Sequence, residues 1–167
     1  MDAAGETLQD VLATVERALA ERMAAAKAAR VDGVPTADEF LDALHQLERR
    51  KEFGKHHKAM LAALHKASER SLTAGELAEA PGWNSYGPAN AHLGSFAREL
   101  SLELGYQPVK ADSRDPSAWT YTLATAAPDR SSEDHFRWRM RPEFAEAFER
   151  FQNGGSASGR PSPTRTR

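Results

Sequence analysis

The small and polar side chains between Asn84 and Arg98 have the types and spacing of a surface that hydrogen-bonds to a partner. A helix turns about 100° per residue, so a helix here would bring Ala91, Ser95 and Arg98 to one side, where the small residues let the backbone approach a surface closely. An asparagine amide can form paired hydrogen bonds with adenine, and an arginine guanidinium can form them with guanine. If this segment lies in the major groove of duplex DNA, we expect the contacts to come from Asn84, Ser85, Tyr86, Asn90, Ala91, Ser95 and Arg98. For Asn90 the alternative is a side chain that caps a helix or stabilises a turn.

Basic side chains elsewhere in the chain could hold the phosphates of the same duplex. Arg137 and Arg139 alternate with the large apolar residues of the segment FRWRM, so both are expected to point away from its apolar side. Arg130, Lys55, Lys58 and the arginines of the C-terminal tail would add contacts that position the protein but read no base sequence. The alternative for Arg137 and Arg139 is plain exposure to solvent.

The chain offers little for catalysis or metal binding. Ser85 has no adjacent base, and no glycine-rich loop carries a lysine placed for a phosphate. His56 and His57 are neighbours in sequence and diverge on a helix, and no carboxylate stands at a ligand spacing convincing for zinc. The sequence has no cysteine, which excludes disulfides, thiolate metal sites and cysteine nucleophiles. We therefore expect a protein that is not an enzyme and that has neither a metal nor a cofactor.

Charge is distributed unevenly along the 167 residues, although the whole chain carries only −2. Residues 1–48 have a net charge of −6, residues 49–70 have +5 and residues 129–167 have +2. Any attraction to nucleic acid must come from such local charge, and the alternative is that these runs are solvated helix faces. No apolar run approaches the ~20 residues that span a bilayer, and the N-terminus is acidic where a secretory signal would be basic. We expect a cytoplasmic protein with no membrane partner.

The first fifty residues predict an arm of two helices. Apolar residues from Leu8 to Met23 recur at spacings of three and four, which is typical of a long amphipathic helix over 7–29. A second helix is expected to start at Thr36, where Thr-Ala-Asp-Glu has the pattern of a capping box. Such an arm cannot bury its apolar side alone. We expect it to fold back on the rest of the chain, to form a homodimer, or to dock on a protein partner.

The middle of the chain predicts further helices. One helix spans about residues 55–68, and a second capping box at Thr73 starts a short helix that Pro81-Gly82 ends. From Ala89 the apolar positions follow a 3.6-residue period. We expect that stripe, formed by Leu93, Phe96 and Leu100, to pack against three leucines of the preceding helices, Leu61, Leu64 and Leu77.

After Gly105 the period of the sequence changes. Large residues alternate with smaller or charged ones over 119–123 and 136–140, which predicts two half-buried strands joined by a long loop. A last helix is expected from Pro142. Residues 152–167 are mostly Gly, Ser, Pro and Arg and predict a disordered basic tail.

The order of helix, short helix, turn, helix, hairpin and closing helix resembles a winged helix-turn-helix domain over roughly residues 55–151. The segment LTAGELAEAPGW (72–83) is similar to the LTxxELAxxLG of many prokaryotic transcription regulators. Two features depart from that family. The insertion NSYGPA lengthens the turn, and the presumed recognition helix over about 86–104 has Arg98 as its only strong cation, against two acidic residues, Glu99 and Glu103. A looser resemblance links GWNSYGPANAHLG, ARELSLELGY and WRMRPEFAEAF to a module of uncharacterised bacterial and phage proteins associated with restriction or defence, and it implies no catalytic residue.

The predicted fold class is mainly α with a small β-hairpin. The predicted domains are a helical N-terminal arm over 1–52, a winged helix-turn-helix-like domain over 53–151 and the tail over 152–167. The resemblance implies a protein that binds double-stranded DNA, either a transcription regulator or a phage- or defence-associated DNA binder. The alternative is a non-enzymatic docking adaptor or inhibitor that acts through protein surfaces, because winged helices also serve as protein-docking modules.

Overall fold

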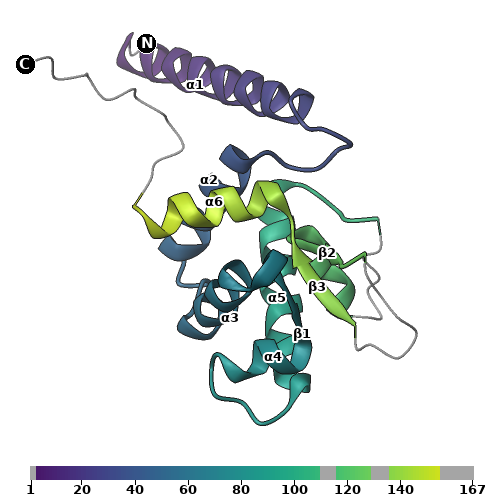
Figure 1. The fold of residues 1–167 in the computed structure, drawn as a ribbon. Helices are drawn as coiled ribbons and strands as arrows, with labels where there is room; N and C mark the ends of the chain where they lie inside the picture. The colour runs from purple at the N-terminus through teal and green to yellow at the C-terminus, as the bar shows by residue number, and fades with distance from the viewer. Residues whose placement is uncertain (1–2, 110–115, 129–135, 155–167) are drawn as a thin grey trace, which may run out of the picture. The chain divides into compact units, whose positions relative to one another are not determined.

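The computed structural model describes residues 3–109, 116–128 and 136–154 (Figure 1). Its contacts divide the chain into one unit of residues 1–36 and a second unit of residues 37–167. The first unit contains the long helix α1 (Ala3–Ala28), which is followed by a turn in which Val31 bridges Val34. The amphipathic helix predicted over 7–29 is therefore confirmed.

The second unit is mainly helical and includes a small antiparallel sheet, as predicted for the fold class. Its elements in chain order are α2 (Ala37–Arg49), α3 (Lys55–Lys66), the 3-10 helix η1 (Ser68–Arg70), β1 (Ser71–Thr73), α4 (Ala74–Glu79), α5 (Tyr86–Leu104), the 3-10 helix η2 (Pro116–Thr122), β2 (Ala124–Ala126), β3 (Arg137–Met140) and α6 (Pro142–Gln152).

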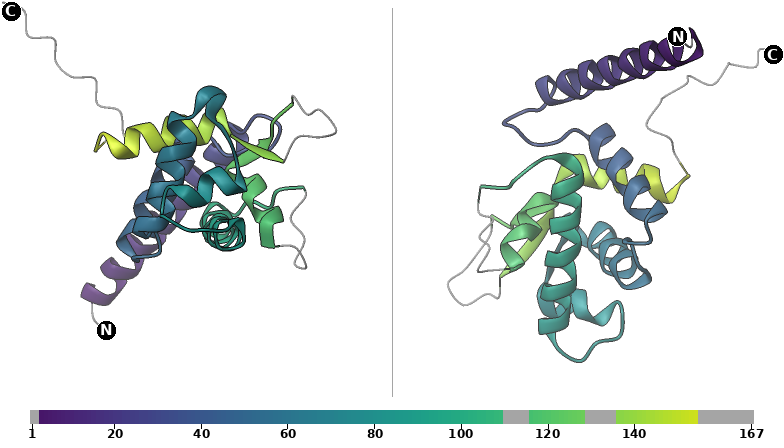
Figure 2. Two further views of the ribbon diagram at one scale, coloured as in Figure 1. Left: turned by 60° about the horizontal axis from the view of Figure 1, so that its bottom comes forward. Right: turned by 180° about the vertical axis from the view of Figure 1, so that it is seen from behind.

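Helix α5 lies at the centre of the second unit. It packs against α3 and α4 on one side and against η2 on the other (Figure 2). Its residues Leu93, Phe96 and Leu100 are buried and share one core with the apolar side chains of α3 and α4, namely Leu61, Leu64 and Leu77, as predicted. Gly94 is buried as well, which fits close packing of neighbouring elements on α5. The helix ends at Gly105, which adopts the left-handed conformation that glycine tolerates best at a helix C-terminus.

Helix α2 belongs to the second unit and not to an arm that ends at residue 52. Its large apolar side chains are fully buried, and α2 packs against both α5 and α6. Phe40 meets Phe144 of α6 edge to face, with 5.3 Å between ring centroids. The compact unit therefore begins at Ala37 rather than at residue 53, because the stripe of α2 supplies part of its core.

The sheet has the order β1-β3-β2, with both pairs antiparallel. Along β3, Trp138 and Met140 are buried while Arg137 and Arg139 are half-buried, so the predicted alternation over 136–140 is confirmed. Strand β1 was not anticipated from the sequence. With only three residues, it is too short to display a period of its own.

The strand predicted over 119–123 is wrong. Residues 116–122 form the 3-10 helix η2, and the strand that pairs with β3 is β2, which starts one residue beyond the predicted segment. Thr120 and Thr122 are buried, whereas Trp119 and Tyr121 are only partly buried, so the alternation has the opposite sense to the expected one. The hairpin between β2 and β3 nevertheless exists.

The capping box at Thr73 forms as the sequence predicts. The Glu76 amide donates to Thr73 Oγ1 at 3.2 Å, and the Thr73 amide donates to Glu76 Oε2 at 2.7 Å. Pro142 occupies the first turn of α6, as expected for the start of a helix. Within the described residues, no helix combines the length and the apolar character needed to cross a bilayer.

Truncating Phe40 tests whether α2 is part of the core. Phe40→Ala should lower the free energy of unfolding by about 3–5 kcal/mol, because it leaves a cavity beside Phe144. The measurement is urea denaturation followed by circular dichroism. The control Leu102→Ala removes an exposed leucine of α5 and should change stability by no more than about 0.5 kcal/mol. Equal effects of the two changes would contradict the assignment of α2 to the core.

Candidate nucleic-acid interface

The turn between α4 and α5 presents polar groups to solvent. Asn84 and Ser85 are exposed in this turn, and Tyr86, the first residue of α5, has 65% of its surface exposed. The turn is longer than that of a tight helix-turn-helix because α4 ends at Glu79. Gly82 has a φ of +83°, a conformation that glycine adopts without strain.

Asn90 lies one turn into α5 and is partly buried. It lines a hollow together with residues from the end of β1, the start of α4, the start of α5 and the approach to β3, namely Thr73, Ala74, Gly75, Tyr86 and Phe136. The fold thus brings the first turns of α5 beside the hairpin and the start of α4. This arrangement gives Asn90 a more enclosed position than the other predicted contact residues on α5.

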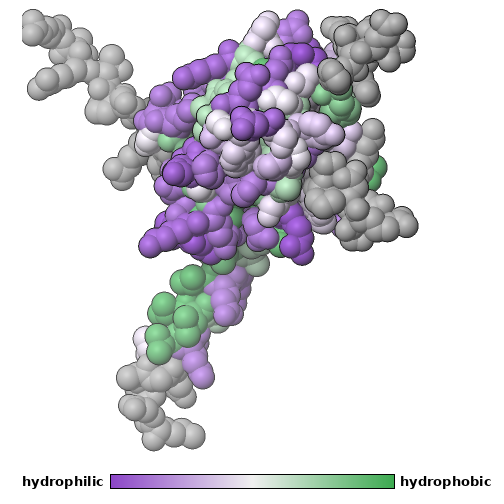
Figure 3. All heavy atoms as spheres, turned by 90° about the horizontal axis from the view of Figure 1, so that it is seen from below, coloured by the Kyte–Doolittle hydropathy of each residue, from purple (hydrophilic) through white to green (hydrophobic). Residues whose placement is uncertain are grey.

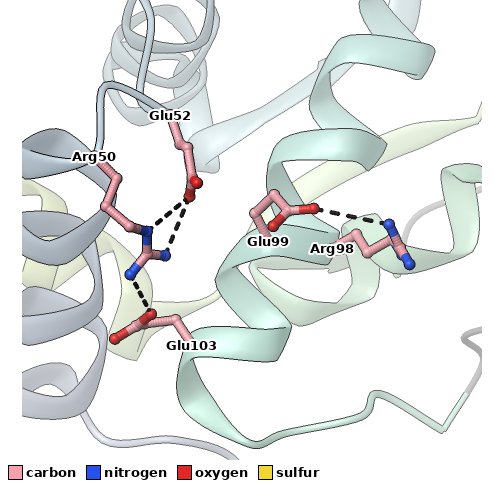
Figure 4. Close-up of polar contacts among 5 residues, drawn as sticks. All are labelled: Arg50, Glu52, Arg98, Glu99 and Glu103. Atoms are coloured by element: carbon pink, nitrogen blue, oxygen red, sulfur yellow. Dashed lines mark hydrogen bonds and ion pairs between the residues drawn. The ribbon is translucent and has the colours of Figure 1, made fainter.

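The side of α5 that the sequence predicts to face solvent is exposed in the structure. Ala91, Ser95 and Arg98 all face solvent, on the side of the helix that the core does not cover. Arg98 lies 3.8 Å from Glu99 on the same helix (Figure 4). The first half of this stripe carries small residues, so a partner surface could approach the helix backbone there.

The acidic residues near the end of α5 are partly neutralised. Arg50 donates to Glu103 at 2.8 Å and to Glu52 at 3.1 Å, and so bridges the segment after α2 to α5 (Figure 4). These hydrogen bonds, the one to Glu103 first, raise the pKa of Arg50 above its usual range. Glu103 therefore opposes an anionic partner less than the sequence alone suggested.

Arg137 and Arg139 both have carboxylate partners within the fold. Arg137 lies 3.2 Å from Glu76 of α4 and donates to the Ser71 carbonyl oxygen, and Arg139 donates to Glu69 at 2.6 Å. A hydrogen bond from the Thr73 amide, together with the charge of Arg137, outweighs the opposing effect of burial and leaves the pKa of Glu76 below its usual range. Both arginines thus tie β3 to the segment around β1, in contrast to the plain solvent exposure considered above.

The remaining predicted phosphate contacts have different surroundings. Lys55 is exposed at the first position of α3. Lys58 pairs with Glu48 of α2 at 2.7 Å and lies over the ring of Phe53, 5.3 Å from its centroid. Arg130 and the arginines of the tail lie outside the described residues.

A cluster of aromatic rings and histidines joins α3 to α5, and sequence reasoning missed it. His56 contacts Trp83 with 5.2 Å between centroids, and His57 packs on Phe96 at 5.1 Å. The ring centroid of His92, on α5, lies 4.9 Å from that of Trp83. It lies 6.5 Å from the ring centroid of His56 and 6.0 Å from that of His57. The two adjacent histidines were expected to diverge, yet both rings lie near that of His92. In the part of the chain that the structure describes, no three His, Asp or Glu side chains are grouped to hold a metal ion.

This environment favours the neutral form of His57. Its Nδ1 accepts the Gly54 amide at 3.2 Å, an interaction that caps the first turn of α3 and needs an unprotonated nitrogen. Burial first, and then the charges of His92 and His56, lower the pKa of His57 from 6.5. A proton on His57 would also add a positive charge at a helix N-terminus, where the helix dipole disfavours it.

Acidification should destabilise the second unit through His57. Because the folded-state pKa is lowered, the unfolded chain binds the proton more tightly, and the free energy of unfolding falls as the pH drops through 6.5. His57→Gln keeps an acceptor for the Gly54 amide and does not titrate, so it should reduce the slope of stability against pH between about pH 7.5 and 5.5. Denaturant unfolding at several pH values measures the slope.

The control His45→Gln makes the same imidazole-to-amide change away from the cap of α3. It should leave more of the pH slope in place than His57→Gln does. An unchanged slope in His57→Gln would contradict the assignment of the pH dependence to this residue.

Comparison of the chain with models of protein families, with curated proteins and with solved structures gives no match.

Proposed function

We propose that the second unit is a winged helix-turn-helix domain that binds double-stranded DNA, with α4 and α5 as the helix-turn-helix and the β2–β3 hairpin as the wing. The order of elements supports this proposal, because a short helix, a turn, a longer helix and a hairpin follow α3 in the sequence. Strand β1 directly precedes α4 and pairs with β3. This pairing fixes the hairpin relative to the two helices, as a wing that flanks a recognition helix requires.

The exposed side of α5 is the observation that carries the proposal. Ala91 and Ser95 are small and Arg98 is cationic, while the stripe formed by Leu93, Phe96 and Leu100 anchors the helix in the core. A helix of 19 residues is about 28 Å long, and the major groove of DNA is wide enough to admit it. The face that includes the α4–α5 turn, seen from below in Figure 3, is mostly hydrophilic. A polar partner therefore fits it better than an apolar one.

The residues have distinct roles in this proposal. Asn84, Ser85, Tyr86, Asn90, Ser95 and Arg98 contact base edges or phosphates from the turn and from α5, and Ala91 allows close approach. Lys55, at the start of α3, contacts a phosphate. Lys58 and Arg130 also contact phosphates. Phosphate binding by Arg137 or Arg139 requires exchange of its carboxylate partner, Glu76 or Glu69. Substituting either arginine also removes a link between β3 and its neighbours, so it is a poor first test of DNA binding.

A protein-docking role without catalysis is the second candidate, and one observation favours it. Arg137, Arg139 and Lys58, three of the cations that would hold phosphates, are paired with carboxylates of the same chain. A surface whose charges are already paired attracts DNA less strongly over distance. The two candidates differ in their dependence on salt, because each neutralised phosphate releases counterions when DNA binds.

Binding of a random DNA duplex to the full chain, followed by fluorescence anisotropy, tests the proposed function. Affinity should fall steeply between about 50 and 200 mM salt. Ser95→Glu places a carboxylate on the exposed side of α5 and should weaken binding at least about tenfold, because it brings like charge against a phosphate. The same assay reports both effects.

Gln152→Glu is the matched control, because it adds the same charge at an exposed position of α6. It should leave the affinity within about a factor of two of the parent chain. Binding that does not change with salt, or equal affinities for Ser95→Glu and Gln152→Glu, would refute the proposed interface on α5 and would favour the docking role.

A further inference from the structure

Helix α1 carries a long apolar stripe that its own unit does not cover. Six of its side chains are each more than half exposed, namely Leu8, Val11, Leu12, Val15, Leu19 and Met23. Figure 3 shows hydrophobic side chains, in green, gathered on the visible part of α1. An apolar stripe of this length is stabilised only when another surface removes it from water.

The spacing of the stripe is that of a helix which packs against another helix. Leu8, Leu12, Val15 and Leu19 follow one another at intervals of four, three and four residues, the repeat of a coiled-coil seam. The stripe is also nearly symmetric about the midpoint between Val15 and Glu16. When two copies run in opposite directions about this midpoint, Leu8 faces Met23 and Leu12 faces Leu19.

The charges of this segment select the direction of pairing. Residues 1–16 carry four acidic side chains and no lysine or arginine, a net charge of −4, whereas residues 17–30 carry four basic side chains and Glu21, a net charge of +3. A parallel pair would place each half beside its like-charged copy. An antiparallel pair places each acidic half beside a basic half, and it also sets the helix dipoles in opposition.

The second unit offers no comparable surface for the stripe. Among its described residues, the large apolar side chains that are exposed are Tyr86, Leu102 and Val109, which are separated in the sequence. The second unit as a whole has a net charge of 0, against −2 for residues 1–36. Its described residues therefore lack the exposed apolar row that a second copy of α1 supplies.

We infer that α1 pairs with α1 of a second copy of this chain in an antiparallel helix pair centred between Val15 and Glu16. The C-terminal ends of the two helices then lie at opposite ends of the pair. This inference does not depend on DNA binding, but a dimer would carry two of the proposed binding domains, as proteins that recognise paired half-sites do.

Disulfide trapping tests the direction, because the chain has no cysteine of its own. In the antiparallel pair, a mixture of full-length Leu8→Cys and Met23→Cys chains should form a mixed disulfide under mild oxidation, identified by peptide mass spectrometry. Neither variant alone should link efficiently. The same cysteine of the second helix lies about 22 Å away along the pair, far beyond the reach of a disulfide. Efficient linking of each variant with itself would show a parallel pair and overturn the proposal.

Sedimentation equilibrium without DNA tests the pairing independently. Leu12→Ser/Leu19→Ser should raise the dimer dissociation constant at least about a hundredfold, because it removes apolar area from the centre of the pair. The control Ala13→Ser/Ala24→Ser changes the opposite side of α1 and should shift the constant by less than about a factor of ten. A parent chain that is monomeric and forms no mixed disulfide would overturn the proposal, whether or not it binds DNA.

Discussion

The second unit depends on the burial of one side of α5. Elements from before and after α5 in the sequence pack on it, and its apolar residues join the side chains of α2, α3 and α4 in one core. Because the core covers one side of the helix, the opposite side is left to face a partner. The same packing that stabilises the unit therefore also decides which residues of α5 are presented, and with them the geometry of the proposed interface.

The outer side of the sheet is organised by charge pairs rather than by apolar contact. Arg137 reaches Glu76 at the start of α4, and Arg139 reaches Glu69 in η1, so the hairpin is tied to both segments that flank β1. Surface pairs of this kind contribute modestly to stability, but they restrict the positions that the hairpin can adopt. Arg137 and Arg139 of β3 thus form ion pairs that hold the hairpin in place. Any anion that binds them must compete with carboxylates already in place.

The sequence predicted the elements with a clear period and missed those that depend on contact between distant segments. The stripe of α5 and the cap at Thr73 were predictable, because each rests on neighbouring residues that favour the same structure. The strand prediction for residues 119–123 was wrong because threonines and aromatic residues alternate there as they would in a strand. In the structure these threonines are buried in a 3-10 helix. The histidine cluster could not be predicted from His56 and His57 alone, since it needs His92 from a helix that lies far along the chain. The predicted contact residues on α5 are exposed, apart from the partly buried Asn90. The carboxylates that pair with the arginines come from elements whose placement the sequence did not reveal.

The contact between α2 and α6 has a consequence for how the chain reaches its native state. Phe40 and Phe144 meet in the core although nearly the whole of the second unit separates them in the sequence. Closing so long a loop costs configurational entropy before the contact returns any stabilisation, so domains rich in such contacts fold slowly. During synthesis, α2 can pack against α5, but Phe40 lacks its contact with Phe144 until α6 has left the ribosome. The core of the second unit is therefore complete only after translation of α6.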